Sequence, residues 1–181
     1  MTKDEYKKID NTFNEAMFLT KINNMFIKIF SAITLDNLEE VKHFMSDEIY
    51  HQFAEALEQD KQNHERHMYD ELNVKTSRLE SIEKTESAYE LTVILHSRYM
   101  DYYLSLETGE VTRGNNSYRI DVLYRLTFTK QKNVKKTNIV RQCPTCGASL
   151  DVDDSGFCPY CHSTYDQIKH DYVLTKIKVC S

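Results

Sequence analysis

The stretch Tyr118–Phe128, YRIDVLYRLTF, shows the clearest alternation of apolar and polar residues in the chain. Every second residue in it is apolar, and four of the five residues between them are polar or charged. Alternation with a period of two is typical of a strand that has one buried face. The sequence therefore predicts a β-strand here, with an apolar face that another layer must cover.

Two further strands are predicted before this one. Alternating residues indicate a strand over 72–82 and a longer strand over 89–106. Polar turns at 83–87 and 107–110 separate the strands, and residues 113–116 (RGNN) have the composition of an additional loop. Long strands joined by short turns pair antiparallel, so we expect a meander.

Helices are expected to supply the covering layer. Apolar residues recur at steps of three and four from Phe13 to Ile33, which predicts an amphipathic helix of about twenty residues. Residues 1–11 are polar, and we expect them to fray or to extend this helix. The helical stripe is interpreted as a face that packs against the sheet.

Two shorter helices are expected next. Asp36 and Glu39 form a capping-box pattern before the first of them, and Ser46 offers a cap for the second. We expect the second of these helices to continue through a mostly polar segment to Tyr69. This would place the sequence HERH at 64–67 on a helix. These histidines are one residue too close for the HExxH metalloprotease motif, so we interpret them as part of a solvated face.

Together these elements predict an α+β fold, with N-terminal helices packed on one face of a curved antiparallel sheet. We expect a pocket between the two layers, lined by apolar residues: Phe26, Phe30, Phe53, Leu91, Val93, Tyr124 and Leu126. The strand residues able to form an acid–base pair are His96, Asp101 and Asp121. A structural role is favoured for them, and no catalytic residue is predicted.

Two CPxC knuckles follow the sheet, CPTC at 143–146 and CPYC at 158–161, with eleven residues (147–157) between them. Four thiolates in two close pairs match the tetrahedral coordination of zinc, and four cysteines leave no open position for a substrate. We therefore expect a zinc ribbon with one structural Zn²⁺ held by Cys143, Cys146, Cys158 and Cys161. Two alternatives stay open, namely His162 as a ligand in place of Cys161, and a redox role for the pairs.

The ribbon is expected to interrupt the main domain. Residues 172–179 alternate and are rich in β-branched residues, and the strand they predict needs a partner in the ribbon or beside the strand at 117–130. We favour the second placement, because a ribbon brings its own ends together, as an insertion in a hairpin requires. The expected domains are residues 1–137 plus 167–181 for the helix-backed sheet, and 138–166 for the ribbon.

Composition and charge narrow the function classes. The chain has 181 residues, 40% of them hydrophobic, and a net charge of −5, which is typical of a packed globule and disfavours a nucleic-acid partner. The one basic stretch is interpreted as a solvated strand end and linker: Lys130, Lys132, Lys135, Lys136 and Arg141. The first residues lack the apolar run of a signal peptide, and no run of about eighteen apolar residues occurs, so we expect a cytoplasmic protein without a transmembrane segment.

The order of these elements resembles the Tim44-like family, the domain of the mitochondrial inner-membrane translocase tether, within the nuclear-transport-factor-like and cystatin-like superfamily. The residues that carry the resemblance are 26–30, 36–38, 46–50, 118–128, 143–148 and 172–174. Bacterial relatives carry a similar ribbon before a terminal strand that often holds a tryptophan, and Tyr172 stands in that place here. The resemblance implies an apolar pocket between helices and sheet, and contact with a partner protein or a membrane surface instead of catalysis.

These observations predict a non-enzymatic binding module with structural zinc. Its pocket is expected to hold a hydrophobic segment of a protein partner or an acyl chain, including at a membrane surface. Two alternatives stay open. One is a small-molecule enzyme that uses a polar pair in the same cavity. The other is a zinc-ribbon nucleic-acid binder, which the acidic charge of the ribbon disfavours.

Overall fold

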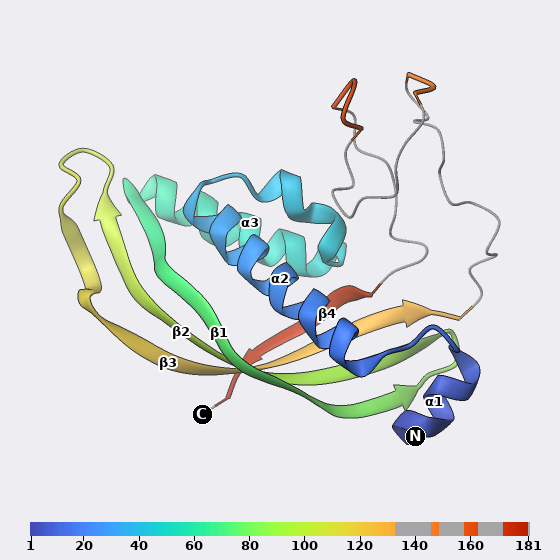
Figure 1. The fold of residues 1–181 in the computed structure, drawn as a ribbon. Coiled ribbons are helices and arrows are strands. Elements are labelled where there is room, and N and C mark those ends of the chain that lie inside the picture. Colours follow the sequence, from blue (N-terminus) through green and yellow to red (C-terminus); the bar gives the residue numbers. More distant parts are fainter. Residues whose placement is uncertain (133–145, 149–157, 163–171, 181) are drawn as a thin grey trace.

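The computed structural model describes residues 1–132, 146–148, 158–162 and 172–180. In these ranges a curved antiparallel sheet carries helices on one face (Figure 1), which confirms the predicted α+β class. The strand order is β1-β2-β3-β4. The strands are β1 (Glu65–Lys84), β2 (Ala88–Ser105), β3 (Val111–Gln131) and β4 (Val173–Val179).

The long helix α2 (Glu15–Thr34) lies across the concave face of the sheet (Figure 1), where the sequence predicted it. The Asn14 side chain caps its start by accepting a hydrogen bond from the Met17 amide at 3.0 Å. One side of the helix is buried over its whole length, through Phe18, Ile22, Met25, Phe26, Ile29, Phe30 and Ile33. This stripe and the inner face of the sheet form the hydrophobic core.

The predicted capping box at Asp36 and Glu39 was wrong. Asp36 lies in the left-handed region (φ 55°) and ends α2, because its amide donates to Ile33 O at 3.1 Å and the Asn37 amide donates to Ala32 O at 2.8 Å. This is a Schellman motif with aspartate at the position that usually holds glycine. The following residues form the 3₁₀-helix η1 (Leu38–Phe44), whose N-cap residue, Asn37, makes no side-chain capping hydrogen bond.

The N-terminal residues form a separate helix, α1 (Lys3–Ile9), instead of fraying or extending α2. Thr2 and Glu5 close a capping box at its start. Tyr6 is fully buried, and its hydroxyl lies 3.0 Å from the hydroxyl of Tyr172. Tyr6, one aromatic residue in a polar stretch, thus anchors the helix on the end of the sheet. A segment this short has too few apolar residues for periodicity to predict the helix.

The predicted extension of the third helix to Tyr69 was also wrong. Helix α3 (Asp47–Gln62), capped by Ser46 as expected, stops at Gln62, and His64 turns the chain in the left-handed region (φ 55°). Strand β1 then begins at Glu65 and pairs with β2 from the Glu65–Ser105 position onward. No glycine or proline marks the end of the helix in this part of the sequence. Pairing with a strand forty residues away therefore overrides the local preference for a helix.

Residues 113–116, expected to be a loop, belong to β3. Gly114 (φ 80°) pairs with Tyr102 inside a bulged part of the β2–β3 ladder. A Cβ atom at Gly114 would lie 2.3 Å from the Asp101 carbonyl oxygen, so the backbones approach too closely for any side chain. The turn-like composition RGNN therefore marks a bulge within a strand.

The last strand, β4, pairs antiparallel with β3 from Tyr124–Val179 to Thr129–Val173. This is the favoured one of the two placements that the sequence left open. Its first residues also contact the helical layer, since the Ser46 amide donates to Leu174 O at 2.9 Å. In the sequence, both cysteine knuckles thus lie between β3 and β4, which are neighbouring strands of the main sheet.

Candidate functional site

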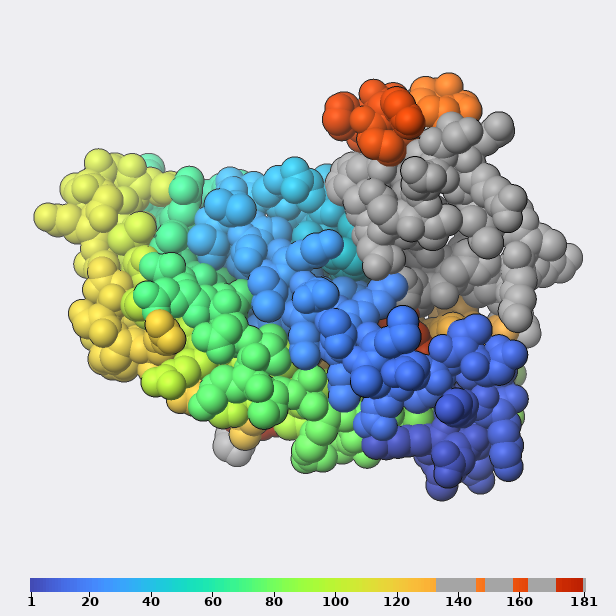
Figure 2. All heavy atoms as spheres, in the orientation of Figure 1, coloured from blue at the N-terminus to red at the C-terminus, as the bar shows by residue number. Residues whose placement is uncertain are grey.

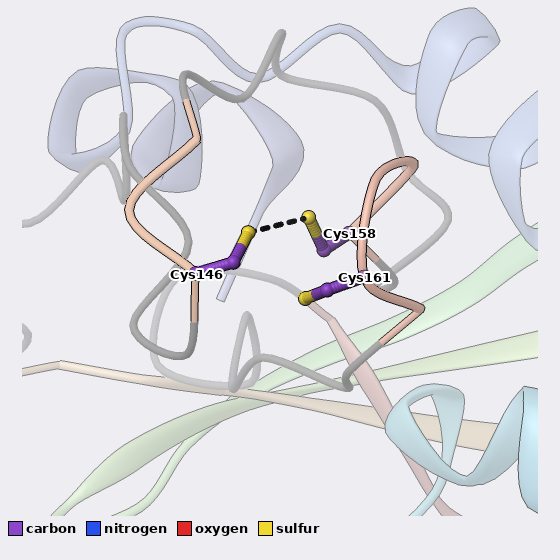
Figure 3. Close-up of side chains that lie close together, drawn as sticks. All are labelled: Cys146, Cys158 and Cys161. Atoms are coloured by element: carbon purple, nitrogen blue, oxygen red, sulfur yellow. Dashed lines mark hydrogen bonds between the residues drawn. The ribbon is translucent and has the colours of Figure 1, made fainter.

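Three of the four predicted metal ligands lie close together. The Sγ atoms of Cys146, Cys158 and Cys161 all lie within 4.8 Å of one another, and Figure 3 shows their side chains pointing into a common space. The Cys146 and Cys158 sulfurs are 3.7 Å apart, and Cys158 is fully buried. Cys143, the fourth predicted ligand, lies outside the described residues.

The described ends of the two knuckles share one backbone feature. The residue after the second cysteine of each pair is left-handed, Gly147 at φ 73° and His162 at φ 57°. In the second knuckle this turn lets the His162 amide donate to Cys158 O at 2.9 Å. His162 thus sits where the first knuckle has glycine, and its residue type gave no sign of this backbone role.

The distance between the Cys146 and Cys158 sulfurs fits a tetrahedral zinc ion. A Zn–S bond of about 2.3 Å and a tetrahedral angle require sulfur atoms about 3.8 Å apart. The observed 3.7 Å between Cys146 and Cys158 agrees with this value. Thiolate is also the donor that zinc prefers in closed structural sites. These three cysteines therefore have the chemistry and the arrangement to hold a metal ion.

The residues predicted to line a pocket occupy the core between α2 and the sheet. Phe53 is partly buried. The other six are buried, with no more than 5% exposure: Phe26, Phe30, Leu91, Val93, Tyr124 and Leu126. The rings of Phe26 and Phe30 stack at 4.2 Å, and both contact Tyr124. Burial, together with a hydrogen bond to Tyr99, raises the pKa of Tyr124 far above its usual value. That these residues line a ligand pocket stays a prediction.

A groove of about 880 Å³ lies along the outward side of α2, and Phe18 and Met25 at the edge of the buried stripe also line it. In Figure 2 this helix crosses the visible face of the molecule between β1 (green) and the segment from η1 to α3 (cyan). The groove follows the helix from Ala16 to Lys28, which is about 18 Å at 1.5 Å per residue. Its other walls come from Phe13, Phe44 and Tyr172. Met17, 72% exposed, lies on its surface.

Lysines stand at both ends of this α2 groove. Lys28 Nζ lies 5.5 Å from the centre of the Phe44 ring, and Lys130 Nζ lies 5.0 Å from that of Tyr172. Lys130 also bonds Asp10 at 2.6 Å. Burial alone would raise the pKa of Asp10, but the hydrogen bonds from Lys130 and Thr12 outweigh it and lower the pKa. The groove thus combines apolar walls with cations held against aromatic rings.

The polar residues proposed for an acid–base pair do not meet in the groove. His96 Nε2 lies 2.7 Å from Asp121 Oδ1, and Asp121 is exposed on the outer face of the sheet. Asp101 pairs instead with His67, which the sequence placed on a helix, at 2.7 Å. The His67 ring stacks on Tyr103 at 4.0 Å. None of these four charged or titratable residues lines the described groove.

A helix-backed curved sheet with an open groove along its long helix defines an α+β domain with the form of a binding module. The family model for the Tim44-like domain matches residues 2–139, which is 138 of the 181 residues. The chain therefore belongs to the Tim44-like domain family, as the resemblance of its sequence indicated. The comparison with curated proteins gives no match.

The family is characterised by a general role of its domains. Tim44-like domains are generally non-enzymatic domains that bind proteins or membranes. The match ends before Cys143, so the knuckles and β4 lie beyond it. None of the described helices combines the length and the apolar composition that a membrane crossing requires.

Proposed function

We propose that this chain is a non-enzymatic binding module that holds an apolar segment of a partner protein in the α2 groove. The observation that carries the proposal is the groove itself, about 880 Å³ in volume and open along three turns of an exposed helix face. An amphipathic helix or an extended apolar segment of a partner fits a surface of this shape.

The chemistry of the groove favours a peptide over an acyl chain. Thr20 and Asn24 are exposed along its floor, between apolar walls. A peptide can offer hydrogen-bonding groups to these side chains, whereas an acyl chain would displace their water without replacing it. Binding of an acyl chain is the alternative outcome that the experiment must distinguish.

Structural zinc is part of the proposal. One Zn²⁺ held by Cys143, Cys146, Cys158 and Cys161 would stabilise a ribbon inserted at 138–166 into the domain formed by 1–137 and 167–181. The pairing of β4 with β3 supports an insertion of this kind. A closed set of four cysteines supports a structural ion in place of a catalytic one. A cytoplasmic location and contact at a membrane surface stay predictions from the sequence.

Asn24→Trp tests the groove, because an indole ring at this exposed floor position fills the space. The control is Gln52→Trp on the exposed side of α3, outside the groove. The chain has no tryptophan, so each variant also reports its folding through a single indole. The probes are a fluorescein-labelled amphipathic peptide of leucine, alanine and glutamine, and a fluorescent fatty acid, both followed by anisotropy.

We expect the peptide to bind the wild-type chain and Gln52→Trp alike, and Asn24→Trp about tenfold more weakly, which is about 1.4 kcal/mol. If only the fatty acid bound, the ligand of the groove would be an acyl chain and not a peptide. Equal loss in both variants, or no binding of either probe, would contradict a ligand site at α2.

A further inference from the structure

The outer face of the sheet, opposite the helices, carries no described helix (Figure 1). Leu79, Val93 and Leu126 are buried on the inner face. Their neighbours along the strands therefore point outward. The register places four outward residues side by side across the whole sheet: Arg78, Ile94, Arg125 and Lys178. Adjacent strands lie about 4.8 Å apart, so this row is about 15 Å wide.

Two further cations lie beside this row, and together they define the outer basic patch: Lys75, Arg78, Arg98, Arg125 and Lys178. Two carboxylates lie among them, Glu80 and Asp121. The patch therefore has five cations against two carboxylates, a net charge of +3. The whole chain carries −5, which leaves −8 for the remaining residues. The charge of this acidic protein is thus strongly segregated.

The carboxylates of the patch are engaged within the protein. Asp121 Oδ1 lies 3.2 Å from Lys75 Nζ and 2.7 Å from His96 Nε2, and Asp121 Oδ2 lies 3.8 Å from Arg98 Nε. Glu80 lies 3.0 Å from Arg125 and is 29% exposed, against 55% for the arginine. Arg125 therefore projects further into solvent than Glu80, whereas Asp121 (46%) is exposed to about the same extent as Lys75 (42%) and Arg98 (44%).

Arg78 and Lys178 are exposed at the two ends of the row. In the described part of the chain, no acidic side chain forms a salt bridge with either of them, in contrast to Lys75, Arg98 and Arg125. An exposed cation without a carboxylate partner is available to a ligand at no cost in broken ion pairs.

We propose that the outer basic patch docks an acidic segment of a partner protein. Leu123, 45% exposed, and half-buried Ile94 lie among the cations. A peptide that alternates carboxylates with apolar side chains matches this mixture. A phosphate backbone has no apolar group to place on Leu123. The His96 ring beside the patch is held against Asp121 and is only 26% exposed, which disfavours stacking of a base on it. This site lies on the opposite face from the α2 groove, so it does not depend on the function proposed there.

Binding of a labelled acidic peptide tests the patch. The probe is a short fluorescein-labelled peptide in which glutamate alternates with valine, and its twin carries glutamine in place of glutamate. We expect the full chain to bind the acidic peptide, and the affinity to fall as salt is raised, because exposed charges are screened. Arg78→Ser with Lys178→Ser should weaken binding about tenfold, since two exposed charge contacts are lost.

The matched control is Lys7→Ser with Lys8→Ser, which removes the same charge from exposed positions on α1. We expect this variant to keep wild-type affinity, and circular dichroism to show that both variants are folded. Equal losses in the two variants would mean a response to net charge alone and would overturn the proposal. So would equal binding of the glutamine twin, no binding by the wild-type chain, or tighter binding of a short single-stranded RNA.

Discussion

The helix-backed sheet and the pair of cysteine knuckles depend on different interactions. In the sheet domain, side chains from α1, α2, η1 and all four strands share one core, and Leu91, Val93 and Leu95 are fully buried. The described knuckle residues bring three sulfurs to within 4.8 Å of one another. The sheet domain gains its stability from buried apolar area, whereas under the proposed zinc site the knuckle region would gain it from a few donor atoms.

This difference decides how each region responds to change. A core distributes its free energy over many contacts, so a single truncation weakens it by a fraction of the whole. A metal cluster concentrates its free energy in one ion, so the loss of one ligand removes nearly all of it. If the two regions are independent, a change in either one should leave the other nearly intact.

The largest effect is expected from Cys158→Ser. Metal binding contributes about 10–16 kcal/mol to structural zinc modules, and a hydroxyl is a poor replacement for a thiolate ligand. We expect about one equivalent of zinc in the purified wild-type chain and far less in the variant, measured by mass spectrometry of the metal content.

The control for this change is Cys180→Ser, which alters a cysteine outside the cluster and should leave the zinc content at its wild-type value. The sheet domain should keep its melting temperature in Cys158→Ser to within a few degrees, because a longer effective loop between β3 and β4 costs only about 0.6 kcal/mol per doubling. Joint loss of zinc and of the cooperative sheet transition would show that the two regions fold as one unit.

The reverse experiment truncates the core with Leu126→Ala. Leu126 is 1% exposed and lies opposite Val93 and Ile177 in the sheet. The free energy of unfolding should fall by about 2–5 kcal/mol through lost burial and a residual cavity, as measured by urea denaturation. The zinc content should not change. A matched change at exposed Leu123, on the outer face of the same strand, should cost far less.

Gly114→Ala sharpens the comparison inside the sheet. The new Cβ would meet the Asp101 carbonyl oxygen at 2.3 Å and would also sit at φ 80°. We expect a loss of about 2 kcal/mol or more in the free energy of unfolding. Gly109→Ala is the control, because Gly109 has nearly the same φ (73°) and nothing within 4 Å of its Cβ position. If both variants lost the same stability, backbone conformation alone would be limiting and the close approach of β2 and β3 irrelevant.

The features that the sequence predicted well are those encoded by regular spacing. The alternation of 118–128 and the apolar spacing of 13–33 each predicted the right kind of element, although Tyr118 (60% exposed) and Met17 (72% exposed) lie outside the core. Three of the four knuckle cysteines lie close together, whereas the ribbon and its zinc stay predictions. The failures occurred where a distant contact decides a local conformation. Asp36 serves as a C-terminal cap, Gly114 lies within a bulge, and β1 begins directly after α3 because β2 offers a partner. The α2 groove was missed because Ala16 and Met17, which line it, belong to the apolar stripe that was expected to pack against the sheet.

The smallest expected effect concerns the Asp10–Lys130 pair, which ties the loop after α1 to the end of β3, next to the point where the chain leaves the sheet. The lowered pKa of Asp10 means that its charged form is favoured by folding. This contribution is present above the pKa of the unfolded carboxyl, near 3.9, and is lost as the pH falls through the lower folded value. Asp10→Asn should therefore lower the free energy of unfolding by up to about 1 kcal/mol at pH 7 and not at all near pH 2, as measured by thermal unfolding.

The more exposed Lys3–Glu15 pair supplies the control, and Glu15→Gln should lower the free energy of unfolding by less at pH 7. A cost of Asp10→Asn that did not shrink on acidification would show that lost packing, and not the ion pair, holds this loop.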